Sequence, residues 1–306
     1  MLNIGLIGGS EKTTNHLSTL QDLNEYFCLK GVFLDVTFSD NLEIVSSLYK
    51  DSYDLIDDVD CVLIVSEVAS HYELSSYALK RGKHLFVESP IAYSVEEAKK
   101  LFNLSVESGG KVYIGCEELF NKGFSCISDY IQRPFLIETF RKVSRNRTLD
   151  NIIYDWMLND VQVALDLVRS GVKRISANAV GVYADWVDVI DVRVEFDNAC
   201  VATIKLDATN EDESLHTYIY QKGHKIDVDF DQNRSRVIYP DRIIELINEE
   251  TYNLNYTSKH YELIAFYNAI LQDSTPKVSI ENSIDALELT KKIMEQVKLL
   301  NPVLVY

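Results

Sequence analysis

Short apolar runs alternate with amphipathic stretches over the first 120 residues. The runs lie at 2–7, 32–34, 61–65, 84–87 and 112–114. This alternation is the βαβ signature of a parallel sheet covered by helices. We therefore predict an α/β fold that begins with a Rossmann-type doubly wound parallel sheet, a dinucleotide-binding-like domain over residues 1–120.

Helix signals lie between these apolar runs. Ser70-His-Tyr-Glu73 and Ser94-Val-Glu-Glu97 have the spacing of capping boxes, so each predicts the start of a helix. The second helix should end at Ser108-Gly109-Gly110, because glycine readily adopts the left-handed conformation that closes helices.

The pattern changes after residue 121. A helical pattern covers 151–169, and helical patterns return at 258–272 and 281–300. Between them, strand-like runs lie at 174–182, 191–196, 200–206, 216–220 and 225–230. Successive strands with short links favour antiparallel pairing. We predict an α+β substrate and dimerisation domain with an open antiparallel sheet over residues 121–306.

Composition narrows the class of partner. The chain has 306 residues, 46% hydrophobic and 25% charged, and a formal net charge of −17 from 47 acidic and 30 basic residues. Nucleic acids and anionic lipids both select for basic surfaces, so we expect neither as a partner. No apolar run has the length of a membrane span, and the start lacks the basic region of a signal peptide. The five cysteines show no metal-ligand spacing, so we expect reduced thiols, a cytoplasmic location and no metal site.

The loop after the first apolar run resembles a dinucleotide loop only in part. A G-x-G-x-x-G motif lets the pyrophosphate approach the backbone and the helix pack closely. Here Gly8 and Gly9 are followed by Ser10, and Thr13 takes the third glycine position. Asp35 lies where a ribose-binding acid would follow the second strand. The alternative is a Rossmann-type turn that binds nothing.

Two further candidates follow the third and fourth runs, at the sheet edge where ligands of open α/β sheets bind. Ser66 and His71 follow the third run, and Glu88 with Ser89 follows the fourth. For His71, the alternative is a solvated histidine at a helix start.

These segments together have a family likeness. "DCVLIVSEVASHYELSSYALKRGKHLFVESP" resembles the Gfo/Idh/MocA family of NAD(P)-dependent sugar and polyol oxidoreductases, in which one strand leads into T-P-x-x-x-H and the next into E-K-P. "VYIGCEELFN" resembles the family's V-G-x-x-E-R-F-N segment, and the last helices also resemble the family's. The resemblance implies an NAD or NADP cofactor bound by Gly8, Gly9, Ser10, Thr13, Asp35, Ser66, His71 and Glu88.

Catalytic positions depart from the family pattern. The resemblance places Ser89 at the family's lysine, which contacts nicotinamide and substrate, and Glu67 at the proline of T-P. The family also carries an aspartate and a histidine four residues apart, matched here by Asp155 and Asn159. Neither serine nor asparagine has a pKa near neutrality, so Asp155 is left as the titratable catalytic candidate.

The helix that carries Asp155 and Asn159 has two faces. A polar stripe continues through Gln162 and Asp166, and the opposite stripe is apolar. The apolar stripe consists of Ile153, Met157, Val161, Ala164 and Val168. Such a pattern is also that of any helix with one solvated face.

Three hypotheses remain open. The first is an NAD(P)-dependent oxidoreductase that acts on a sugar, polyol or sugar nucleotide with degraded lysine and histidine positions, and with weak or absent cofactor binding. The second is a non-catalytic relative that binds a small carbohydrate-like ligand or a partner protein. The third is different chemistry that uses Asp155 with Glu88 or Glu118. Because Val192, Val194, Phe196, Val201 and Thr203 alternate with charged residues, we also predict a homodimer or higher homo-oligomer formed through the outer sheet face.

Overall fold

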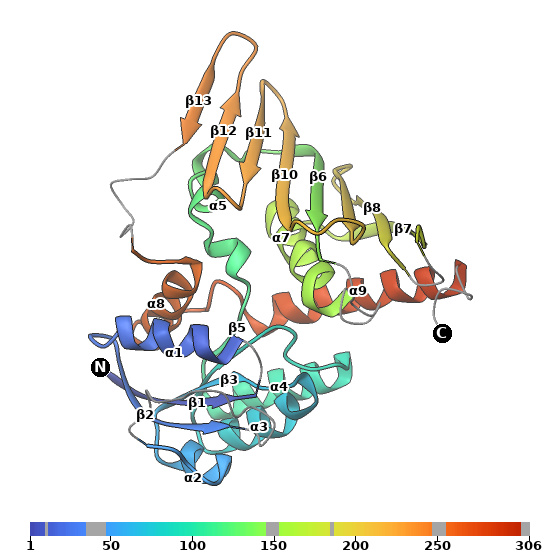
Figure 1. Ribbon diagram of the computed structural model, residues 1–306. Helices are drawn as coiled ribbons and strands as arrows, with labels where there is room; N and C mark the ends of the chain where they lie inside the picture. The colour runs from blue at the N-terminus through green and yellow to red at the C-terminus, as the bar shows by residue number, and fades with distance from the viewer. Residues whose placement is uncertain (10–11, 35–46, 145–152, 184–186, 247–254, 301–306) are drawn as a thin grey trace. The chain divides into compact units, whose positions relative to one another are not determined.

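The computed structural model describes residues 1–9, 12–34, 47–144, 153–183, 187–246 and 255–300 (Figure 1). The chain forms two compact units. Unit 1 consists of Met1–Glu117 and Tyr256–Asp285, and unit 2 of Glu118–Asn255 and Ala286–Tyr306. The contiguous division at residue 120 that the sequence predicts does not include this return of 256–285 to unit 1.

Unit 1 is a five-stranded sheet in the order β2-β1-β3-β4-β5, with parallel pairing throughout. Its strands are β1 (Leu2–Gly8), β2 (Phe27–Leu34), β3 (Cys61–Val65), β4 (His84–Val87) and β5 (Val112–Ile114). The predicted doubly wound sheet is confirmed. Every residue of β3 and β5 is buried, which explains why these strands read as unbroken apolar runs.

Helices cover both faces of this sheet. They are α1 (Lys12–Asp22), α2 (Ser52–Asp57), α3 (Val68–Lys80), α4 (Val95–Ser108) and α8 (Ser258–Leu271). Helices α1 and α8 lie on one face, and α2, α3 and α4 lie on the other (Figure 1). The prediction for α4 is confirmed, because the Ser94 hydroxyl accepts from the Glu97 amide and Gly109 closes the helix at φ 71°.

The predicted capping box at Ser70 is wrong. Helix α3 starts three residues earlier, with Glu67 at the N-cap and no side-chain cap. The Ser70 hydroxyl instead donates to the Glu67 carbonyl at 2.8 Å and contacts the Ser66 hydroxyl at 2.7 Å. Ser70 therefore ties the first turn to the end of β3 from inside the helix.

Unit 2 is built on an eight-stranded sheet in the order β13-β12-β11-β10-β6-β9-β8-β7. Its strands are β6 (Pro134–Lys142), β7 (Val172–Val180), β8 (Val189–Phe196), β9 (Val201–Asp207), β10 (Ser214–Gln221), β11 (His224–Asp229), β12 (Arg234–Ile238) and β13 (Ile243–Leu246). Pairing is antiparallel except between β6 and β9, which run parallel. The predicted sheet is thus mostly antiparallel, with a parallel pair at its centre because helical and hairpin segments separate β6 from β9 in the chain.

Most helical segments of unit 2 are short, and the two longer ones are α7 and α9. They are η1 (Glu117–Phe120), α5 (Lys122–Ser125), η2 (Ser128–Tyr130), a π-helical turn η3 (Ile153–Met157), α7 (Leu158–Val168) and α9 (Ile280–Leu300). Glu117 and the first residues of α9 belong to unit 1. The helix expected at 151–169 is therefore a π turn followed by an α-helix over its described residues. No helix in the described ranges has both the length and the apolar character needed to cross a membrane.

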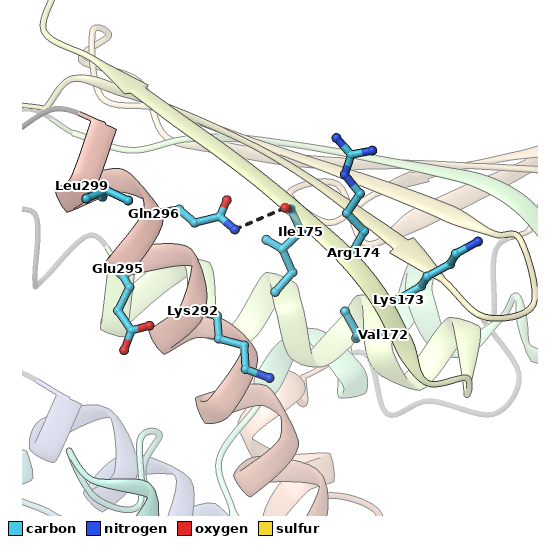
Figure 2. Close-up of a pocket in the computed structure, with 8 residues that line it drawn as sticks. All are labelled: Val172, Lys173, Arg174, Ile175, Lys292, Glu295, Gln296 and Leu299. Atoms are coloured by element: carbon cyan, nitrogen blue, oxygen red, sulfur yellow. Dashed lines mark hydrogen bonds between the residues drawn. The ribbon is translucent and has the colours of Figure 1, made fainter.

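Strand β7 forms one edge of the sheet, and α9 lies beside it (Figure 2). The side chain of Gln296 accepts from the Ala177 amide at 2.9 Å and donates to the Ile175 carbonyl at 3.2 Å. A cavity of about 390 Å³ lies beside this contact, and Lys173 and Arg174 point away from the helix. One side-chain amide thus fills the place of a neighbouring strand's peptide group.

Candidate functional site

Glu88 directly follows β4 and is the centre of a charge cluster in unit 1. Its carboxylate contacts the Lys12 ammonium at 2.8 Å and His16 Nε2 at 2.5 Å. Lys259 Nζ lies 3.6 Å from Glu88 and 3.2 Å from Glu117. Glu88 is 8% exposed, so this buried carboxylate is surrounded by three nitrogen groups from α1 and α8.

The charges of this cluster are fixed by their neighbours. Burial alone would raise the pKa of Glu88, but Lys12 and Lys259 hold it well below its ordinary value. Burial opposes the charge on Lys259, yet Glu88 and Glu117 raise its pKa. Lys12 also has a raised pKa, chiefly from Glu88. At neutral pH the cluster therefore holds two permanent cations, which suit anion binding better than proton transfer.

His16 is the neutral member of the cluster. The ring is fully buried, and burial lowers its pKa despite the contact with Glu88. A neutral ring donates its Nε2–H to Glu88. His16 Nδ1 has no hydrogen-bond partner among the described residues.

Ser89 brings no charge to this corner. Its side chain is half-buried and has no hydrogen-bond partner within the described ranges. The cations next to Glu88 come from Lys12 and Lys259, which are far from Ser89 in sequence. The sequence singled out Glu88 and Ser89 but missed these partners. Lys12 and His16 did carry a signal, since they lie four residues apart on the helix after the nucleotide-type loop.

His71 joins the two strand ends. Its Nδ1 lies 2.8 Å from the Pro90 carbonyl and its Nε2 lies 2.9 Å from the Ser66 carbonyl. Burial lowers the pKa of His71, although both carbonyls favour the charged ring. Because burial is the larger effect, we take the ring as neutral, with one nitrogen donating. At 1% exposed, His71 is not the solvated histidine that was the alternative expectation.

The loop after β1 is filled by its own side chain. The Gly9 amide donates to Thr13 Oγ1 at 3.2 Å, and Thr13 is fully buried. A Cβ on Gly8 would lie 2.3 Å from Thr13 Cγ2, so glycine is required there by Thr13. Ser10 and Asp35 lie outside the described residues. In the described part of this loop, Thr13 therefore takes the Gly9 amide that a pyrophosphate would need.

A second buried carboxyl group lies near the cluster. Glu262 Oε1 accepts from the Cys116 amide at 2.6 Å, and Oε2 has no hydrogen-bond partner among the described residues. Burial raises the pKa of Glu262 well above its ordinary value, although Lys259 opposes the shift. Burial thus favours the neutral form of the Glu262 carboxyl group.

In unit 2, Asp155 lies in the π turn η3 and Asn159 in the first turn of α7. Asp155 is exposed and Asn159 is half-buried. The predicted apolar stripe from Ile153 to Val168 is buried at every position, which confirms that face. Gln162 is 6% exposed, so the expected polar stripe does not continue as a solvated surface. π turns are frequent at functional sites, which keeps Asp155 a candidate.

Glu118, the other acid considered for catalysis, belongs to a closed ion network. Arg141 on β6 donates to Glu118 at 2.9 Å and to Asp160 at 2.6 to 3.1 Å. The guanidinium carbon lies 4.9 Å from the ring centroid of Trp156. Glu118, Arg141 and Asp160 are all buried. A carboxylate held this way cannot accept a proton without losing its ion pair, so Glu118 is poorly suited to acid–base work.

One group of potential metal ligands occurs within the described residues, formed by His216, Asp229 and Asp231. Asp229 accepts from the Gln232 amide and Asp231 from the Leu215 amide. Backbone amides thus donate to both carboxylates. The predicted absence of a metal site stays a prediction.

The five-stranded parallel sheet of unit 1, with helices on both faces, has a Rossmann-type fold. Residues 2–116 match a family model described as "Oxidoreductase family, NAD-binding Rossmann fold". This match agrees, over these residues, with the resemblance to the Gfo/Idh/MocA family that the motifs carry.

Relatives agree with this assignment. A UDP-N-acetylglucosamine 3-dehydrogenase of Acidithiobacillus ferrooxidans is 25% identical over 197 residues, 60% of each chain. A myo-inositol 2-dehydrogenase of Thermotoga maritima is 22% identical over 193 residues, 58% of each chain. The aligned segment thus spans less than two thirds of these relatives.

Solved structures extend the fold likeness to nearly the whole chain. The structure of the Acidithiobacillus ferrooxidans enzyme has a TM-score of 0.86 at 20% identity and covers 97% of this chain and 98% of that one. A levoglucosan dehydrogenase in complex with NADH and levoglucosan has a TM-score of 0.83 at 16% identity, with 97% of each chain covered. At these identities the likeness supports the fold.

Proposed function

We propose that this chain is a Gfo/Idh/MocA-type oxidoreductase for a sugar, polyol or sugar nucleotide, with reduced hydride transfer and weak NAD or NADP binding. Relatives that act on a sugar nucleotide and on inositol support the substrate class. The observation that carries the reduced activity is Ser89, which stands at the family's lysine and has no partner among the described residues. A cytoplasmic location is part of the proposal.

NAD or NADP, when bound, would supply hydride exchange at the nicotinamide. The described loop fits the pyrophosphate poorly, because Thr13 already accepts from the Gly9 amide. Lys12, with a side chain 49% exposed, could turn toward an anion only by leaving Glu88. Under the proposal Asp155 holds or moves a proton, and Asn159 and Ser89 hydrogen-bond hydroxyl groups of the ligand.

The second candidate is a non-catalytic relative that keeps the fold to bind a carbohydrate-like ligand or a partner protein. The self-filled loop between Gly8 and Thr13 favours it, since a fold without its cofactor transfers no hydride. Residual turnover separates this candidate from the first.

The test is hydride transfer measured by NAD(P)H absorbance against a panel of sugars, polyols and sugar nucleotides. We expect turnover far below the ordinary range of about 1–10³ s⁻¹ and dissociation constants for NAD and NADP above about 1 mM by calorimetry. The double change Ser89→Lys, Asn159→His should raise residual turnover by about 10²-fold, because it restores titratable side chains at the two positions where the family carries its lysine and histidine.

The matched control is Ser105→Lys, Asn103→His on α4, which should leave the rate unchanged. Low-micromolar cofactor binding with ordinary wild-type turnover would refute the proposal. Complete inactivity of the wild type and of the double variant would favour the non-catalytic candidate.

We also propose a homodimer or higher oligomer through the outer face of the eight-stranded sheet. Phe140 is 43% exposed on this face, and its ring lies 6.2 Å from that of Tyr218. Exposed aromatic side chains are typical of interface cores. Light scattering should give at least the mass of a dimer at micromolar concentration, and Phe140→Glu should reduce it to the monomer, whereas a monomeric wild type would contradict the proposal.

A further inference from the structure

A histidine and two aspartates come together on the outer face of the eight-stranded sheet in unit 2. His216 on β10 and Asp229 on β11 are paired directly across the two strands, and Asp231 lies in the turn that follows β11. His216 points outward, because its neighbours Leu215 and Thr217 are the buried residues of β10. The ligand atoms of the three side chains all lie within 4.8 Å of one another. Strand pairing, and no motif in the sequence, therefore assembles this group.

The spacing between these groups leaves room for an ion. His216 Nε2 lies 3.8 Å from Asp229 Oδ1, which is too long for a hydrogen bond. Two ligands of a tetrahedral Zn²⁺ ion, each about 2.0–2.1 Å from the metal, lie about 3.3 Å from each other. The pair is thus slightly wider than a bound ion requires. Both side chains are half-buried, so rotation of either one can close the difference.

Backbone amides orient both carboxylates. The Gln232 amide donates to Asp229 at 2.9 Å, and the Leu215 amide donates to Asp231 at 3.2 Å. The second bond ties the turn back to β10, the strand that carries His216. A carboxylate has about four lone-pair sites, so each aspartate keeps acceptor capacity beside its amide bond. Carboxylates that ligate metals are themselves hydrogen-bonded in this way.

The cavity beside these ligands suits an ion better than an organic molecule. Its volume is about 170 Å³, below the roughly 300 Å³ at which small-molecule sites begin. Three carboxylates and two guanidinium groups line it, from Asp227, Asp229, Glu245, Arg234 and Arg236. Arg236 donates to Asp227, and Asp231 adds a fourth carboxylate next to Asp229. The carboxylates thus outnumber the guanidinium groups, which favours a cation.

We propose that His216, Asp229 and Asp231 bind a divalent transition-metal ion, with Zn²⁺ as the best fit. Imidazole and carboxylate are both zinc ligands, whereas Ca²⁺ takes about six to eight oxygen ligands and Mg²⁺ keeps several waters. Three protein ligands leave a fourth tetrahedral position for water or for a group from another molecule. A metal here would contradict the prediction, from cysteine spacing, that the chain has no metal site. The site shares no residue with the proposed oxidoreductase groups, so each can fail without the other.

Titration of the full, untagged chain with Co²⁺, a coloured substitute for Zn²⁺, tests this site. We expect the d–d absorption of Co²⁺ with protein ligands to saturate at one equivalent, with a dissociation constant in the micromolar range. Added Zn²⁺ should bleach this absorption. In proton NMR, paramagnetic Co²⁺ should broaden one histidine ring signal before the others. The chain has 6 histidines, and His216→Asn assigns that signal.

Two variants each remove one ligand. His216→Asn and Asp231→Asn should each weaken Co²⁺ binding by at least about tenfold, because only three protein ligands hold the ion. Asp231→Asn keeps a side-chain oxygen for the Leu215 amide, so the turn should keep its conformation. Circular dichroism without metal checks that both variants fold.

Matched controls replace the same residue types elsewhere in unit 2. His224→Gln on β11 and Asp241→Asn, at an exposed aspartate, should leave the dissociation constant for Co²⁺ unchanged. Binding only in the millimolar range, or binding that both ligand variants keep, would mean an adventitious ion only and would overturn the proposal. A chain that develops no d–d absorption with Co²⁺ overturns it as well.

Discussion

Two charge clusters, one in each unit, both surround buried carboxylates with basic groups, but the basic groups differ. In unit 2, one guanidinium of Arg141 satisfies two carboxylates and stacks on Trp156, and all four hydrogen bonds are 3.1 Å or shorter. In unit 1, Glu88 is contacted by two flexible lysines and a histidine, and Lys12 is half-exposed. A planar, bidentate arginine fixes a fold, whereas lysines that reach a carboxylate singly can exchange it for another anion.

The difference teaches where to look for function. The Arg141 network lies on the inner face of a sheet and has no exposed member. The Glu88 cluster lies at the carboxyl end of a parallel strand, where open α/β sheets bind ligands. Burial and charge are alike in the two places, so the position in the fold and the exposure of one lysine separate a structural cluster from a candidate site.

The largest expected effect comes from breaking the network of unit 2. Arg141→Met should lower the free energy of unfolding by about 3–5 kcal/mol, because Glu118 and Asp160 stay buried without a cation. Urea unfolding measures the loss. Arg193→Met, which breaks an exposed pair with Glu195, should cost under about 1 kcal/mol. Equal losses in the two variants would show that the network is not structural.

A smaller loss is expected in unit 1. Lys259→Met should cost about 1–3 kcal/mol, since Glu88 keeps Lys12 and His16. The variant should also raise the pKa of His16, because Lys259 helps to lower it. Proton NMR of the His16 ring measures this shift. Lys111→Met removes a lysine paired with exposed Asp273 and should leave the His16 pKa unchanged. An unchanged His16 pKa in Lys259→Met would contradict the cluster.

The smallest effect concerns Glu262 and depends on pH. Its folded pKa is raised, so its contribution to stability is present below the unfolded value near 4.3 and is lost as pH rises through the folded pKa. Glu262→Gln imitates the protonated acid, so it should match wild type near pH 4 and exceed it by about 1–2 kcal/mol at pH 8. Urea unfolding midpoints of the variant and of wild type, measured between pH 4 and pH 8, show whether the two stabilities separate as pH rises.

The matched control is Glu107→Gln at an exposed position of α4, which should run parallel to wild type at every pH. A Glu262→Gln curve that also stays parallel to wild type would mean that Glu262 is ionised in the folded protein.

Sequence reasoning succeeded where one physical signal dominated. The bounds of β3, β4 and β5 agree with the apolar runs, because these short strands are almost entirely buried. It missed β6, because two of that strand's inward positions are Thr139 and Arg141, and the polar residues there hide the alternation. The charge on Arg141 is tolerated inside because Asp160 and Glu118 pair with it, a fact no local pattern contains.

The alternation pattern of β9 also misleads. Val201 and Thr203 were grouped with Val192, Val194 and Phe196 as positions that alternate with charged residues, but Thr203 pairs with Arg193 and both point outward. Ala202, Ile204 and Leu206 are the buried residues. Register across the β8–β9 hairpin decides the face, and a shift of one residue inverts it.

At the candidate site, motifs located Glu88 and His71 but not their partners. Lys259 reaches Glu88 from α8, near the other end of the chain. The unpaired acid Glu262 likewise depends on Cys116 and on burial. Such contacts between distant segments form only when the chain folds. A single sequence therefore locates individual motif residues of a site more readily than the charged groups that surround them.

The Gln296 contact on β7 has a consequence for the behaviour of the protein in concentrated solution. An uncovered edge strand is a template on which further chains can add strand by strand. At this edge one glutamine side chain occupies the Ala177 donor and the Ile175 acceptor, and the described part of the opposite edge strand, β13, has 4 residues. The Gln296 amide thus helps to block strand addition at the β7 edge, which makes Gln296 a poor choice for substitution in any variant intended for storage at high concentration.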